Sequence, residues 1–115
     1  MTPEQKRRLA DMQCLAQILL DRTMEDLRRA RTRREVAEFQ AERIAVALSG
    51  TPETVQDIAS RAGAHALWRD DMAARRANLN GEIARCRVAE EQVKKAALRA
   101  FGRQAALRNL LDKVR

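Results

Sequence analysis

The chain has few of the residues that build a compact globular core or interrupt a helix. It contains no tyrosine, one tryptophan, two phenylalanines, two prolines and four glycines among 115 residues. Instead, 45% of the residues are apolar and 34% are charged, and alanine, leucine, arginine and glutamate dominate. This composition is typical of long helices and coiled coils. The regular apolar spacing described below argues against disorder as the explanation of so many charges.

The residues that catalysis and metal binding require are also scarce. His65 is the only histidine, and nothing in the sequence supplies the partner that a general base needs. The two cysteines, Cys14 and Cys86, form no CxxC pattern. The sequence has neither a glycine-rich phosphate loop nor a GxSxG motif. We therefore expect no catalytic residue, no metal and no cofactor, and we predict that the protein is not an enzyme.

Long apolar runs are absent as well. No stretch approaches the ~20 apolar residues that a membrane span needs. The opening MTPEQKRRLADMQ is polar and unlike a secretory signal. With two cysteines and no such signal, we expect a cytosolic, reduced protein.

What the sequence does contain is two long helical segments. Thr2-Pro3-Glu4-Gln5 has the order of a capping box, with a hydroxyl cap and a glutamine three residues later. We predict a helix over residues 3–49, a connection with a short helix over 50–67, and a helix over 68–115. In the connection, Thr51 repeats the opening signal and Gly63 is positioned to end the short helix.

Both long segments carry a heptad repeat. Steps alternating between four and three residues select mostly apolar positions, nine of twelve in the first segment and ten of thirteen in the second. We call these positions the seam. The first segment contributes Leu9, Gln13, Ala16, Leu20, Thr23, Leu27, Ala30, Arg34, Ala37, Ala41, Ile44 and Leu48. The second contributes Met72, Arg76, Leu79, Ile83, Cys86, Glu90, Val93, Ala97, Ala100, Gln104, Leu107, Leu111 and Val114. A repeat of 3.5 residues kept this long requires a partner helix.

The seam predicts an all-α fold, a long antiparallel two-helix coiled-coil hairpin that occupies residues 1–115 as a single domain. If residue 49 lies near residue 68, Gln13 faces Gln104 and Cys86 faces a position near residue 31. The sequence around Asn78 and Gly81 is poor for a helix, but the heptad keeps its phase there, so we expect a continuous helix.

The net charge of +7 is unevenly distributed. Residues 92–115 hold seven Lys and Arg against Asp112 alone. The hairpin brings this segment beside the N-terminus, and the two together predict a basic partner-binding surface. Its residues are Lys94, Lys95, Arg99, Arg103, Arg108, Lys6, Arg7 and Arg8. We interpret the other arginine cluster, over residues 28–34, as a solvated face in which acids at helical spacing form ion pairs with the arginines.

Several apolar residues lie off the seam. They are Leu15, Leu19, Val36, Phe39, Val46 and Phe101. So many indicate that another protein, or the connection itself, covers part of the helix surface. Trp68 either anchors the connection or is an exposed interface residue. We list Trp68, Phe39 and Phe101 as candidate partner anchors.

The closing segment VAEEQVKKAALRAFGRQAALRNLLDK, with its V...Q.KKAAL.A pattern, resembles the FliJ/YscO family. These are small coiled-coil stalk proteins of flagellar and virulence type III secretion, and the similarity spans most of the chain. The resemblance implies that the paired termini enter the pore of a hexameric export ATPase and promote its assembly and activity. It also implies contacts with the export gate and with chaperones, with only a peripheral place at the inner face of the cytoplasmic membrane.

Two alternatives remain open on the residues alone. A nucleic-acid-associated or regulatory helical protein could use the basic C-terminal end, although the scarcity of aromatics and the neighbouring acids disfavour nucleic acid. A homodimeric four-helix scaffold would bury the off-seam apolar residues between two hairpins.

Overall fold

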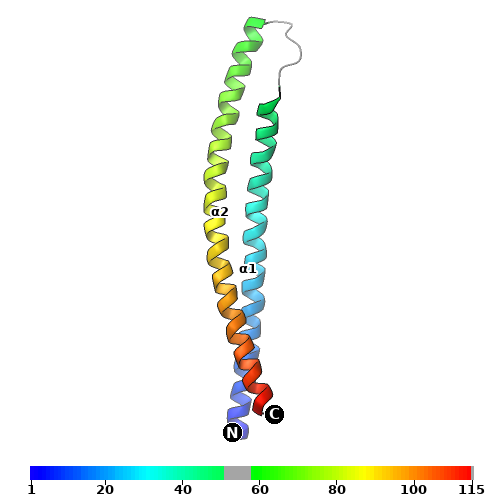
Figure 1. The fold of residues 1–115 in the computed structure, drawn as a ribbon, viewed down its shortest axis with the longest axis vertical. Helices are drawn as coiled ribbons and strands as arrows, with labels where there is room; N and C mark the ends of the chain where they lie inside the picture. The colour runs from blue at the N-terminus through cyan, green and yellow to red at the C-terminus, as the bar shows by residue number, and fades with distance from the viewer. Residues whose placement is uncertain (51–57, 115) are drawn as a thin grey trace. The chain divides into compact units, whose positions relative to one another are not determined.

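The computed structural model describes residues 1–50 and 58–114, and for residues 58–62 it describes the backbone only. All of these residues except Met1, Thr2 and Gly50 belong to two helices: α1 (Pro3–Ser49, 47 residues) and α2 (Ile58–Val114, 57 residues). The described ranges contain no strand. The predicted all-α, two-helix hairpin is confirmed (Figure 1).

The predicted start of α1 is present in detail. The Thr2 amide donates to Gln5 Oε1 at 3.0 Å, and the Gln5 amide donates to Thr2 Oγ1 at 3.2 Å. These reciprocal bonds satisfy amides that have no partner inside the helix. At the other end, the Ser49 hydroxyl donates to the Val46 carbonyl at 2.8 Å.

The predicted start of the second helix was wrong. We expected it at Trp68, but α2 begins at Ile58, ten residues earlier. Gly63 does not end a helix; it lies within α2, and no glycine among the described residues has a positive φ. One glycine costs only about 1 kcal/mol in a helix, and the alanines around it offset that cost. The predicted short helix from Thr51 falls largely outside the described residues.

Helix α2 also continues without interruption through Asn78 and Gly81, as the unbroken heptad phase predicted. The two helices contact each other within two compact units. The terminal unit comprises residues 1–31 and 88–115, and the central unit comprises residues 32–87. Each pairs a segment of α1 with a segment of α2, and we describe each separately.

The central unit contains a small apolar cluster. Ala37, Ala41 and Ile83 are buried, and Leu79 packs against them. Hydrogen bonds also join the two helices: Arg87 donates to Glu38 at 3.1 Å, and Arg69 donates to the Leu48 carbonyl at 3.0 Å. The position on α2 falls as the position on α1 rises, so the pairing is antiparallel.

The terminal unit is held together mainly by alanine. Its buried residues are Ala16, Ala30, Ala97, Ala100 and Gln104. In both units together, every seam position of α1 is buried or half-buried, and so is every seam position of α2 except Arg76. Alanine lets two helices approach closely, but each buried methyl adds only about 0.8 kcal/mol. The heptad prediction is therefore confirmed, and the core is narrow.

The predicted register is shifted by one turn in the terminal unit. Arg31 pairs with Glu90, with Nε and Oε1 4.0 Å apart, whereas we expected Cys86 to face this position. The described residues include no hydrogen bond between Gln13 and Gln104. Gln104 is nonetheless buried.

Candidate partner-binding surface

The eight predicted basic residues all belong to the terminal unit and are all exposed. Five lie on α2 between positions 94 and 108, and three lie in the first turns of α1. Of these eight, only Arg8 forms an ion pair with another described residue, with Glu4 at 3.0 Å. Lys94, Arg99 and Arg108 have no carboxylate partner there. We call these eight residues the basic surface.

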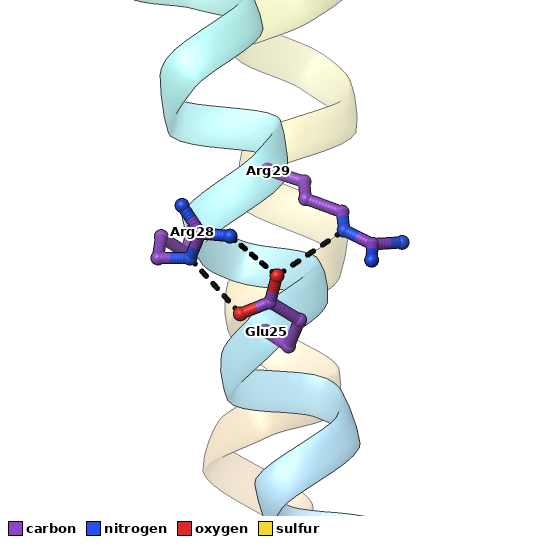
Figure 2. Close-up of polar contacts among 3 residues, drawn as sticks. All are labelled: Glu25, Arg28 and Arg29. Atoms are coloured by element: carbon purple, nitrogen blue, oxygen red, sulfur yellow. Dashed lines mark hydrogen bonds and ion pairs between the residues drawn. The ribbon is translucent and has the colours of Figure 1, made fainter.

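The arginine cluster of α1 is different because acids of the same helix pair with several of its members. Figure 2 shows the Arg28 guanidinium donating twice to the Glu25 carboxylate, with Nε 2.9 Å from Oε2, while Arg29 donates to the same carboxylate at 3.3 Å. These bonds lower the pKa of Glu25 and raise that of Arg28, chiefly through the hydrogen bond between them. The interpretation of a face in which acids and arginines pair is confirmed here.

A second carboxylate of this kind lies in the central unit. Glu38 accepts from Arg34 at 3.1 Å and from Arg87 at 3.1 Å. The Arg87 hydrogen bond is the main cause of the lowered pKa of Glu38, and Arg34 adds to it against the opposing effect of partial burial. Glu38 therefore ties the helices of the central unit together and also holds an arginine of its own helix.

Exposed apolar residues of α2 lie beside members of the basic surface. Leu98 is 62% exposed and Phe101 is 58% exposed. Lys94 and Arg108 lie at helical spacing on either side of them, so the four residues lie along one stripe of the helix. Sequence reasoning identified Phe101 and missed Leu98, although its position off the seam was the available signal. The arrangement combines cations with a short apolar strip, which suits a partner that offers carboxylates around an apolar patch.

The other two candidate anchors lie in the central unit and already have neighbours there. Phe39 is 64% exposed, and the guanidinium of Arg43 lies 6.0 Å from its ring centroid. Trp68 is 38% exposed and stacks on His65 with centroids 5.6 Å apart and planes at 27°. The structure thus separates these two residues from Phe101, which belongs to the other unit.

The six off-seam apolar residues named from the sequence are all exposed. Sequence reasoning missed others that share this exposure. In α1 these are Met12, Ile18 and Met24, at 53%, 64% and 51%. Met12 and Ile18 form a patch with Leu15 and Leu19.

One open groove of about 540 Å³ lies on the central unit, between α1 and α2. Its lining is Gln40, Arg43, Ile44, Ala47, Met72, Arg75, Asn78 and Leu79. It contains no cysteine, histidine, serine or carboxylate among these residues. Cys14 and Cys86 are both free, and no three His, Cys, Asp or Glu side chains gather in the described part of the chain.

The described helices include none that is both long and apolar enough to cross a bilayer. Comparison with known proteins adds no identity: no family model matches the chain, and neither a curated protein nor a solved structure matches it.

Proposed function

We propose that the protein is a non-enzymatic coiled-coil component of a type III or flagellar export apparatus. It acts as a stalk that binds and stimulates the hexameric export ATPase and links it to the export gate and to chaperones. The proposal draws on the resemblance of the closing segment of α2 to the FliJ/YscO family and on the hairpin fold. It locates the protein in the cytoplasm, with a peripheral place at the inner face of the membrane through its partners.

The observation that carries this proposal is that most cations of the basic surface have no ion-pair partner among the described residues. The arginines of residues 28–34 include several held by carboxylates of the chain itself, whereas Lys94, Arg99 and Arg108 meet none in the described residues. Unpaired cations gathered in one segment of a helix attract acidic partners, and the attraction extends about 8 Å at physiological salt. An acidic lining of a ring-shaped ATPase would supply the missing carboxylates.

The exposed apolar residues give such a contact its close-range part. Leu98 and Phe101 lie among the cations of α2 and are exposed. Apolar and aromatic side chains at the centre of a protein interface contribute most of its binding free energy, while charges at the rim set the rate and orientation of association. The basic surface therefore has both kinds of group that a protein partner uses.

The proposal is tested by reversing the charge of Arg99, Arg103 and Arg108 to Glu. The triple variant should lose its stimulation of ATP hydrolysis by the purified export ATPase of the same organism. A matched control reverses Arg33, Arg43 and Arg85, which are exposed arginines of the central unit. This control makes the same change in net charge and should stimulate like the unmodified chain. Unchanged stimulation by the first variant would refute the proposal.

The same two variants separate a protein partner from nucleic acid. A protein that used the basic surface to neutralise phosphates would bind DNA or RNA in a gel-shift assay, and the binding would weaken steeply with salt. We expect no shift at roughly 0.15 M salt, the regime in which phosphate contacts are strongly reduced. A shift that the triple variant abolishes would replace the stalk by a nucleic-acid-binding function.

A further inference from the structure

The face of α1 that points away from the seam has a pattern of its own in the terminal unit. Starting at Glu4 and alternating steps of four and three residues, it consists of eight residues. They are Glu4, Arg8, Asp11, Leu15, Ile18, Arg22, Glu25 and Arg29. Seven are exposed and Glu25 is half-buried. Because the steps match those of the seam, the eight positions form one continuous row along α1. We call this row the outer face.

The outer face is complementary to its own reversed copy. Leu15 and Ile18 flank its midpoint, which lies between residues 16 and 17. At equal distances from this midpoint, each acid has a base as its counterpart. The three mirrored pairs are Asp11 with Arg22, Arg8 with Glu25, and Glu4 with Arg29.

A twofold interface requires this arrangement, because residue i of one copy meets residue j of the other and the reverse also holds. In antiparallel helices with alternating three- and four-residue steps, such mirrored positions form successive layers. We propose that two copies of this chain associate antiparallel through the outer face of α1. The layer of Leu15 and Ile18 lies at the centre of the interface, and the three opposite-charge layers lie on both sides of it.

The centre of this interface is an apolar patch that the single chain leaves uncovered. Leu15 is 67% exposed and Ile18 is 64% exposed. Met12 and Leu19 border them on one side, at 53% and 42%. A second copy covers all four, and each copy supplies the same four residues. Burial of apolar surface provides the attraction, and the charged layers set the register.

The existing ion pairs of the outer face need not break to form the dimer. Within one chain, Glu4 pairs with Arg8 at 3.0 Å and Glu25 pairs with Arg29 at 3.3 Å. In the antiparallel dimer, the first pair faces the second pair of the other copy with the signs reversed, so that four charges alternate in a square. Asp11 and Arg22 have no ion pair among the described residues and gain one only in the dimer.

The cations of α2 lie outside this contact. The basic surface lies mainly on α2, and the outer face points away from α2, so the dimer leaves Lys94, Arg99 and Arg108 exposed. The outer face and the basic surface share Arg8 and no other residue. Its apolar centre is small, so we expect a reversible dimer at the weak end of the range of specific interfaces.

Charge exchange between the two mirrored positions Asp11 and Arg22 tests the proposal. Sedimentation equilibrium over roughly 1 to 200 μM covers the affinity range of such an interface. D11R and R22D should each weaken the homodimer at least tenfold, because the D11R chain carries arginine at both positions and the R22D chain carries aspartate at both. An equal mixture of the two should form a heterodimer with close to the original affinity. The double variant D11R/R22D should also dimerise.

Two measurements keep the test specific. Circular dichroism should show that the single variants remain helical, since both positions are exposed and face away from the seam. The matched pair L15E and V88E introduces glutamate at exposed apolar residues of the same unit, at 67% and 60%. L15E should abolish dimerisation and V88E should leave it unchanged. A wild-type chain that stays monomeric at 200 μM, or single charge variants that associate as wild type does, would overturn the proposal.

Discussion

The terminal and central units share one construction and differ in net charge. Each pairs α1 with α2 around a seam whose fully buried residues are mostly alanine. The terminal unit has 14 Lys and Arg against 8 Asp and Glu, a net charge of +6, whereas the central unit has 9 against 8, a net charge of +1. Carboxylates hold arginines in both units, through Glu4 and Glu25 in the terminal unit and through Glu38 and Asp71 in the central unit. The cations of the terminal unit that have no such partner in the described part of the chain include Lys94, Arg99 and Arg108. The number of arginines in a segment therefore says less about binding than whether carboxylates lie within reach of them.

The two units also differ in the neighbours of their exposed aromatic side chains. In the central unit, Phe39 has Arg43 over its ring and Trp68 has His65 beside it. In the terminal unit, Phe101 has no ring or cation contact among the described residues. Among the described residues, Phe101 is therefore the exposed aromatic side chain that has no such neighbour.

The largest expected effect is on stability, and it comes from a charge placed at a buried alanine of the seam in one unit only. Ala100 of the terminal unit is 3% exposed and Ala37 of the central unit is 2% exposed. Ala100→Asp and Ala37→Asp should each lower the free energy of unfolding by about 3 kcal/mol or more, because an unpaired carboxylate is then buried. Hydrogen exchange read by mass spectrometry should show faster exchange mainly in the unit that carries the change.

The controls for this pair are Ala106→Asp and Ala77→Asp, at exposed positions of the terminal and central units. Both should be close to neutral. If either buried substitution caused an equal loss of protection from hydrogen exchange in both units, the two units would unfold together. They would then differ in net charge but not in stability.

Glycine replacement has a smaller, opposite effect in both units. A Cβ added at Gly102 of the terminal unit meets nothing within 4 Å, and one added at Gly81 of the central unit lies 3.6 Å from Arg85 Nη1, an ordinary contact. Gly102→Ala and Gly81→Ala should each raise the free energy of unfolding by about 0.5–1 kcal/mol, because alanine loses less backbone entropy in a helix. Urea unfolding followed by circular dichroism measures this. A lower stability of G102A would mean that this position is not open in solution.

The smallest expected effect is a dependence of stability on acid pH in each unit. The pKa values of Glu25 and Glu38 are lowered, chiefly by hydrogen bonds from Arg28 and Arg87. Lowered folded-state values contribute stability above the ordinary carboxyl pKa, and this stability is lost as the pH falls through the folded-state values. Thermal unfolding from pH 6 to about pH 3 should therefore show a decline that Glu25→Gln and Glu38→Gln each reduce. An identical pH profile for all three chains would contradict the ion pairing described here.

The heptad repeat was enough to predict most of the fold. Burial of nearly every seam position follows from the alternating steps of four and three, because two helices in contact must repeat their contact every 3.5 residues. The start of α2 could not be predicted in this way. Gly63 is a helix-ending signal only when it adopts a positive φ, and the choice between that state and a helical glycine depends on contacts that the local sequence does not contain.

The register and the binding surface were predictable to different extents. The pairing of Arg31 with Glu90 differs by one turn from the prediction because alanine at so many seam positions gives neighbouring registers similar packing. The basic residues were found from charge alone, but their lack of carboxylate partners needed the structure. Ile18 escaped notice because one apolar residue off the seam means little until its row along α1 is examined.

The two native cysteines give each unit a separate chemical reporter. Cys14 is exposed in the terminal unit, and Cys86 is a half-buried seam residue of the central unit. Both are free thiols, so the unmodified chain can be alkylated without engineering. Cys14 should react at the rate of an open helix surface, and Cys86 only as fast as the seam around it separates. The ratio of the Cys86 and Cys14 alkylation rates in one sample then measures how fast the helices separate in the central unit, with Cys14 as the internal reference.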